Sequence, residues 1–171
     1  MSGLRMDIKV EGLAEMFRDL GRIDPELRKA AVRRVYDAGK TIQADARSRI
    51  PTTPPMSGWS RRRGQRGKWN WSPGQSRSRI RLKVSTGSAK RDEIRLIRVI
   101  QSDAAGAIYD MAGRKTSGRT PNGQQFVRNL NRRGRASRTM WPAAEARSRD
   151  VERALTQAVD DMANTINRRM R

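Results

Sequence analysis

The sequence predicts an α+β domain in which two long helices pack on a small antiparallel sheet, with two long basic loops or arms. Three observations predict it: apolar residues recur at helical spacing in two long segments, short apolar segments lie between them, and the surplus positive charge is confined to two stretches. A chain of 171 residues has room for one core, so we expect a single domain over residues 1–171.

The first predicted elements are short. Residues 6–10 alternate apolar and polar side chains, which is typical of a half-buried strand, and this strand should end at Gly12. A brief helix follows and should stop at Gly21. Its apolar face consists of Leu13, Met16, Phe17 and Leu20.

A long helix is predicted from Asp24 to Ile50. Asp24 can cap the helix N-terminus with Pro25 in the first helical position, and the proline after Ile50 disfavours further helical geometry. The helix spans about 25 residues, roughly 37 Å. Its apolar stripe, which we interpret mainly as core, is Leu27, Ala31, Val35, Ala38, Ile42, Ala46 and Ile50.

Glycine and proline interrupt the next region, so residues 51–77 are predicted to be an extended basic loop without regular structure. Residues 78–86 and 93–102 are predicted to be two strands of an antiparallel hairpin, and residues 106–113 a further short strand. A second long basic loop is predicted over 113–138. The last helix should begin near Thr139 and run to Arg171.

The net charge of +21 is segregated along the chain. No acid lies between Asp45 and Asp92, where 13 basic residues occur, or between Asp110 and Glu145, where eight occur. The remaining 17 basic residues balance the 17 acids. The sequence therefore predicts a charge-balanced body with two cationic inserts.

Cysteine and histidine are both absent, which removes thiolate nucleophiles, the usual zinc ligands and the side chain best suited to proton transfer at neutral pH. We therefore expect a non-enzyme with no catalytic residue, cofactor or metal. A hydrolase built on carboxylates is the third hypothesis. The sequence shows neither the apolar core of a signal peptide nor 18 consecutive apolar residues, so we expect a soluble protein made in the cytoplasm, with no membrane partner.

Three of the four tryptophans, Trp59, Trp69 and Trp71, lie in the first predicted loop. Tryptophan and arginine dominate interface energetics, so we predict that these side chains anchor the loop on a neighbouring subunit. Packing in the core of their own domain is the main alternative, and base stacking on single-stranded nucleic acid is a third.

The arginine-rich runs of both loops are the candidate contacts with anions. Arginine outnumbers lysine in them, which favours planar anions, so the runs are predicted either to face double-stranded DNA or to pair with acids of neighbouring subunits. A solvated charge run is the simplest alternative. The residues are Arg61, Arg62, Arg63, Arg66, Lys68, Arg128, Arg132, Arg133, Arg135 and Arg138.

The order of several short motifs resembles the tail-component family of long-tailed bacteriophages, the neck and tail-completion proteins at the head–tail junction. These motifs are the strand and small helix of "IKVEGLAEMFRDL", the helix end with Ala46, Arg47 and Pro51, and a small-residue step at Ser57 and Gly58. Further along the chain, the family's remaining motifs are matched by Tyr109 with Gly113 and by Trp141, Pro142 and Ala143.

The resemblance implies a structural virion protein that forms a ring of six or twelve copies. Such a ring would join the head connector or stopper to the tail terminator or tail tube, after assembly in the host cytoplasm. Tyr109 and Trp141 then join the three loop tryptophans as candidate subunit contacts. The alternative function is a nucleic-acid-binding protein whose basic arms embed in RNA or DNA.

Overall fold

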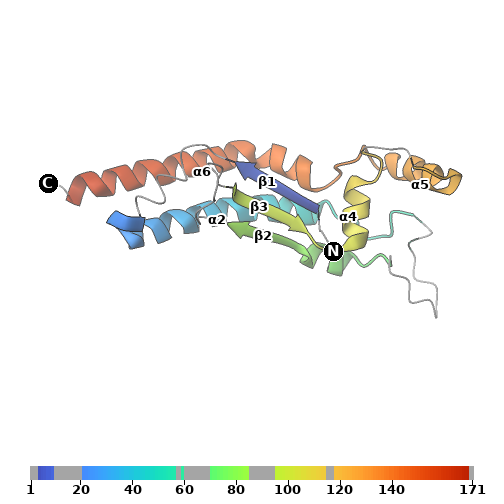
Figure 1. The fold of residues 1–171 in the computed structure, drawn as a ribbon, viewed down its shortest axis with the longest axis horizontal. Coiled ribbons are helices and arrows are strands. Elements are labelled where there is room, and N and C mark those ends of the chain that lie inside the picture. Colours follow the sequence, from blue (N-terminus) through green and yellow to red (C-terminus); the bar gives the residue numbers. More distant parts are fainter. Residues whose placement is uncertain are drawn as a thin grey trace.

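A computed structural model describes residues 4–9, 21–56, 59, 70–84, 95–114 and 118–169 (Figure 1). It is an α+β fold with two long helices and a small antiparallel sheet, which confirms the predicted fold class. The elements, in chain order, are β1 (Leu4–Lys9), α2 (Pro25–Ser48), α3 (Pro73–Ser78), β2 (Ile80–Val84), β3 (Arg95–Gln101), α4 (Ala104–Met111), α5 (Pro121–Asn131) and α6 (Met140–Arg169).

Helix α2 begins as the sequence predicts. The Asp24 carboxylate accepts hydrogen bonds from the backbone N–H groups of Glu26 and Leu27, at 3.0 and 3.1 Å, and Pro25 opens the helix. The predicted apolar stripe supplies the buried face, although Leu27 and Ala38 are only partly buried. The residues that α2 buries are Ala31, Val35, Gly39, Ile42 and Ala46.

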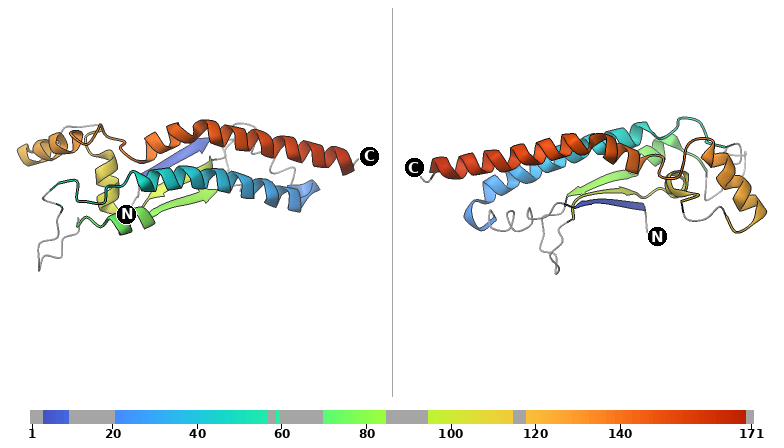
Figure 2. Two further views of the ribbon diagram at one scale, coloured as in Figure 1. Left: turned by 180° about the vertical axis from the view of Figure 1, so that it is seen from behind. Right: turned by 90° about the horizontal axis from the view of Figure 1, so that it is seen from above.

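Helices α2 and α6 run antiparallel, side by side along the length of the molecule (Figure 1). Val151, Leu155, Ala158 and Met162 of α6 are buried at helical spacing, as predicted. On the exposed side of the contact, Arg34 of α2 forms an ion pair with Asp161 of α6. The pair of helices forms one layer, and the sheet forms the second layer against one of its faces (Figure 2).

The sheet has the strand order β1-β3-β2, and both pairings are antiparallel. Ile80 pairs with Gln101 and Val84 with Ile97, so the predicted hairpin pairing is confirmed. Ile97, Val99 and Gln101 alternate as the buried residues of β3. Strand β1, also predicted, pairs with β3 from Leu4 to Lys9, with a bulge at its end.

The predicted strand at 106–113 is wrong, because residues 106–111 belong to helix α4 and the chain turns at 112–113. Asp103 caps the helix by accepting a 2.8 Å hydrogen bond from the N–H of Gly106. Ala104, Ala105 and Ala107 favour a helix over a strand. The cap and the small residues thus outweigh the short apolar alternation.

The two predicted loops also contain helices. Helix α3 lies within 51–77 and α5 within 113–138, except that α3 extends to Ser78. Each starts with a hydroxyl cap and a proline: Ser72 accepts from the N–H of Gln75, and Thr120 accepts from the N–H of Gly123. Proline in the first turn starts a helix instead of breaking one, which is the physical reason for the correction.

In the N-terminal region, the predicted helix over 13–20 lies outside the described residues. Residues 21–23 are helical, so Gly21 is not itself the end of helical geometry.

Candidate functional site

An aromatic cluster joins the segments around α3, α4 and α5. The rings of Trp59 and Trp71 stack with centroids 5.3 Å apart and an interplanar angle of 6°. Phe126 of α5 meets Trp59 edge-on at 5.5 Å, and Tyr109 of α4 meets Trp71 in the same way at 5.5 Å. Trp59, Trp71 and Tyr109 are each less than a tenth exposed. The cluster is part of the core.

This burial corrects the prediction that Trp59, Trp71 and Tyr109 contact neighbouring subunits. They pack inside their own chain, the alternative that the sequence left open for the two tryptophans. The physical reason is that the cluster removes large apolar surfaces from water without any partner chain. The Trp71 backbone N–H also donates to the Trp59 carbonyl at 3.2 Å, so these two residues close the base of the segment between them. Trp69 lies outside the described residues.

A buried carboxylate fixes the start of α6. Asp110, in the last turn of α4, is 1% exposed. Its carboxylate accepts hydrogen bonds from the backbone N–H and the hydroxyl of Thr139 and from the N–H of Met140, the first residue of α6. A negative charge at a helix N-terminus satisfies free N–H groups and interacts favourably with the helix dipole. Asp110 therefore acts as a cap that is distant in sequence.

The opposite contact fixes the end of α4. The Arg138 guanidinium donates to the carbonyl of Tyr109 at 2.7 Å and to that of Ala112 at 3.2 Å, while its Nε donates to the carbonyl of Gly134 at 2.9 Å. The same guanidinium donates to the Asn131 side chain at 3.0 Å. Cations near a helix C-terminus satisfy its free carbonyl groups. Helices α4 and α6 are thus tied together at their ends by Asp110 and Arg138, and we call this pair of contacts the reciprocal cap.

Arg138 is therefore not a DNA-facing or acid-pairing residue, which corrects its prediction. It is 8% exposed, and its guanidinium is hydrogen-bonded inside the chain. Burial lowers the pKa of its guanidinium, while Tyr109 and Asp110 oppose this effect. The group stays charged at neutral pH because arginine does not deprotonate in proteins. Its role is to hold α4 and the segment before α6 together.

The other arginines predicted in the second loop are exposed. Arg128 lies in α5 and Arg132 directly follows it; both are exposed, whereas the α5 residues Val127 and Leu130 are buried. Arg133 and Arg135 follow in the turn after α5 and are also exposed. These four arginines, which we call the α5 arginine face, form no ion pair within the described part of the chain. The predicted cations Arg61, Arg62, Arg63, Arg66 and Lys68 lie outside the described residues.

Trp141 differs from the buried tryptophans. It lies in the first turn of α6 and is 61% exposed, whereas its neighbours Met140 and Ala143 are almost fully buried. The reciprocal cap holds the backbone at this point, so a large apolar ring is presented to solvent from a fixed position. Its predicted role as a subunit contact stays a prediction.

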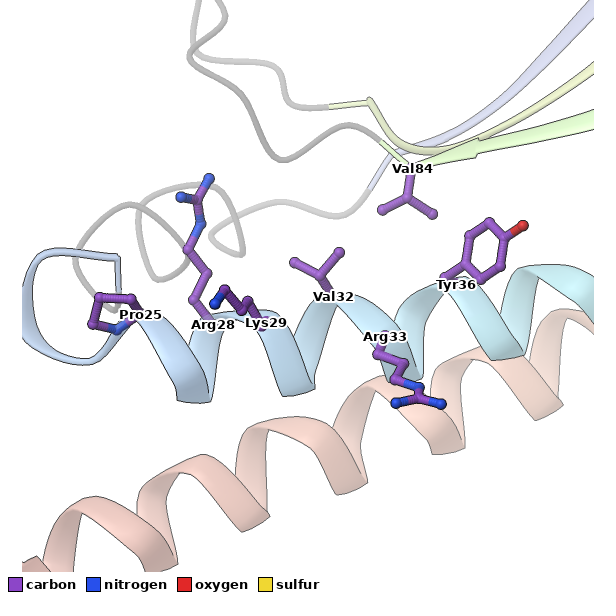
Figure 3. Close-up of a pocket in the computed structure, with 7 residues that line it drawn as sticks. All are labelled: Pro25, Arg28, Lys29, Val32, Arg33, Tyr36 and Val84. Atoms are coloured by element: carbon purple, nitrogen blue, oxygen red, sulfur yellow. The ribbon is translucent and has the colours of Figure 1, made fainter.

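The structure adds a groove that no sequence pattern indicated. It has a volume of about 580 Å³ and lies along α2 beside the end of β2 (Figure 3). Val32 and Val84 point toward one another across it, and Tyr36 lies beside them. Its cationic lining residues are Arg28, Lys29 and Arg33. None of the predicted site residues lines this groove.

Sequence reasoning missed the structural roles of Asp110 and Gln101. Gln101 is 1% exposed; it donates to the carbonyl of Ser76 at 3.0 Å and accepts from the N–H of Asp103 at 2.9 Å. Polar residues inside an otherwise apolar strand or helix are the available signal, because a buried polar group requires hydrogen-bond partners. The partners themselves are up to 30 positions away and leave no local pattern.

No group of three or more acidic, histidine or cysteine side chains that could hold a metal ion occurs in the described ranges. Among the helices that the structure describes, none combines the length and the apolar character needed to cross a bilayer. Comparison of the chain with protein-family models, with curated proteins and with solved structures finds no match.

Proposed function

We propose that this chain is a structural virion protein of the neck of a long-tailed bacteriophage. In this proposal, copies assemble into a ring that joins the head connector or stopper to the tail terminator or tail tube. The proposal starts from the order of motifs along the sequence, which resembles that of the tail-component family. The single structural observation that carries it is the exposure of Trp141.

Trp141 supports the proposal because it exposes a large aromatic ring beside the buried residues that begin α6. It is one of three large hydrophobic side chains that are clearly exposed among the described residues, with Ile23 and Tyr36. The contacts of Asp110 fix the adjacent backbone, so the ring is presented with little loss of entropy on binding. Tryptophan is among the residue types that contribute most to binding at protein interfaces.

The resembling motifs also meet in space. Tyr109 belongs to one of them, and Trp141 begins another. The reciprocal cap brings the two segments together, since Asp110 binds the N–H of Met140, the residue just before Trp141. This arrangement holds Trp141 at a fixed place on every copy, which supports its use as a repeated subunit contact.

The test is the substitution Trp141→Ala. We expect the free energy of unfolding to change by less than about 0.5 kcal/mol, since the side chain that is removed is mostly exposed. We expect ring formation by the purified protein, seen in negative-stain images, and incorporation into particles to be strongly reduced. Ile23→Ala removes another exposed apolar side chain, 72% exposed, and serves as the matched control.

Two outcomes would contradict the proposal. If Trp141→Ala assembles like the unchanged protein and like Ile23→Ala, Trp141 is not the subunit contact. If the unchanged protein forms no rings, is missing from purified particles and binds nucleic acid tightly at low salt, the protein is a dedicated nucleic-acid binder instead.

A further inference from the structure

The outer face of α5 is polar, cationic and free of acids. Its exposed side chains include Gln124, Gln125, Arg128 and Arg132, and its apolar side chains turn the other way, with Leu130 fully buried. Arg133 and Arg135 lie in the turn that follows α5 and add two further exposed guanidinium groups. The face therefore offers many hydrogen-bond donors and positive charges, with no carboxylate to neutralise them.

The backbone beneath this face is fixed at both ends. Thr120 caps the start of α5 by accepting a 3.1 Å hydrogen bond from the N–H of Gly123. Beyond the helix, Arg138 holds the turn through its bonds to the Asn131 side chain and to the carbonyl of Gly134. The arginines of the face therefore project from an ordered scaffold, which lowers the entropy cost of binding an anion.

We infer that the α5 arginine face binds the phosphate backbone of double-stranded DNA without recognising its sequence. Arg128, Arg132, Arg133 and Arg135 contact phosphates, since guanidinium groups match phosphate oxygens in geometry and charge. The inference rests on the proposed function for its biological setting, because DNA passes through a phage neck. It does not need the ring in order to be tested.

A second copy of the chain is a poorer match for this face. Most subunit interfaces have an apolar or aromatic centre, and the outer side of α5 has none, whereas protein–DNA interfaces are more polar and much more positive. In addition, several of the chain's own acids are already paired. Asp37 pairs with Lys40, Asp150 with both Arg147 and Arg153, and Asp161 with Arg34.

The two exposed surfaces therefore differ in the kind of partner that they suit. Trp141 offers an apolar ring and suits a protein neighbour, while the α5 arginine face offers only donors and suits a polyanion. Arg138 belongs to the same arginine-rich run, but it is buried and holds the backbone that carries the exposed arginines.

The experiment measures binding of the purified full chain to a 30-base-pair DNA duplex at salt concentrations between 50 and 200 mM. One variant replaces the four arginines of the face by glutamine, which keeps helix propensity. The matched control replaces four exposed arginines elsewhere, Arg22, Arg33, Arg149 and Arg168, by glutamine, so that the net charge changes equally. Circular dichroism and the thermal midpoint confirm that both variants are folded.

We expect the slope of log K against log salt to become shallower by about one for each arginine–phosphate interaction that is removed, so by about four for the α5 variant. The control should change the slope by less than about one. A second duplex of unrelated sequence should bind equally well, because phosphate contacts carry no sequence information.

Three results would overturn the inference. Equal changes in both variants would mean that only net charge matters, and no change in the α5 variant would mean that DNA binds elsewhere. Absence of DNA binding, combined with salt-sensitive self-association that the α5 variant abolishes, would assign the face to acids of a second copy. If instead DNA binds as expected but the chain neither forms rings nor enters particles, the proposed function fails and this inference stands.

Discussion

Individual residues of the reciprocal cap show how buried polar groups organise this protein. Asp110 and Arg138 do not act as a simple ion pair. Asp110 accepts from backbone N–H groups at the start of α6, and Arg138 donates to a backbone carbonyl in the last turn of α4, beside Tyr109. Removing either side chain leaves buried backbone groups without partners, and each such group costs about 1–3 kcal/mol.

Tyr109 gives this region a pH dependence. Burial raises the pKa of its phenol above the ordinary value, an effect to which Asp110 adds and which Arg138 and Arg133 oppose. A group whose pKa is higher in the folded state contributes stability that is complete below its unfolded pKa, about 10 for tyrosine, and is lost as the pH rises through the folded value.

We therefore predict that Tyr109→Phe changes the pH dependence of stability. The unchanged protein should lose stability relative to Tyr109→Phe as the pH rises above about 10. Below a pH of about 9 the difference between the two proteins should be constant, because the phenol is protonated in both states. Urea denaturation across this range measures it, and parallel curves throughout would show that the phenol does not titrate with the predicted sign.

At the scale of elements, α4 packs closely against the end of β3, where Gly106 lies against the Gln101 side chain. A Cβ atom added at Gly106 would lie 2.5 Å from the side-chain nitrogen of Gln101, which is buried and bonded to the Ser76 carbonyl. Gly74 in α3 differs, because nothing lies within 4 Å of its added Cβ. The two glycines are therefore a matched pair for testing this packing.

Gly106→Ala should destabilise the protein by about 1–3 kcal/mol through overpacking. Gly74→Ala should be neutral or should stabilise it by up to about 1 kcal/mol, since alanine restricts the unfolded chain. Chemical denaturation of both variants gives the comparison. A Gly106→Ala protein as stable as Gly74→Ala would show that Gln101 moves aside freely.

The starts of the helices show which local sequence signals are sufficient to predict a helix. An N-cap residue followed by proline begins α2, α3 and α5, at Asp24, Ser72 and Thr120. Only the first of these helices is predicted from the sequence, because a long apolar stripe follows it. In the other two cases the surrounding glycines and prolines favour loops, although the same cap chemistry is present.

At the scale of the whole molecule, parts of the predicted cationic inserts belong to the folded core. Trp59 and Trp71 belong to it, since they are buried and their backbones are bonded to each other. The segment of residues 60–69 between them carries Trp69 and five of the basic residues. Because the backbone bond between Trp59 and Trp71 already brings the two flanking residues together, we expect that shortening the segment leaves the core intact.

We predict that replacing residues 60–69 with a short Gly-Ser bridge leaves a folded monomer, with a thermal midpoint close to that of the unchanged protein. We expect ring assembly and incorporation into particles to be abolished, because the contacts with neighbours predicted from the sequence for Trp69 and for the basic residues of this segment are removed. A bridge of Gly and Ser residues that keeps the original length of the segment controls for length. Normal assembly of both proteins would exclude this segment from the mechanism.

The sequence alone determined the two long helices, the antiparallel hairpin, strand β1 and the segregation of charge. These features rest on caps, apolar periodicity and residue counts, which act within a turn of helix or a pair of strands. The tertiary structure decided which aromatic and charged residues are internal. Trp59 is buried because Phe126 lies against it, and Arg138 is buried because α4 ends beside it. Such contacts join segments far apart in the chain, so the burial of a side chain in an irregular segment depends on partners that local patterns do not specify.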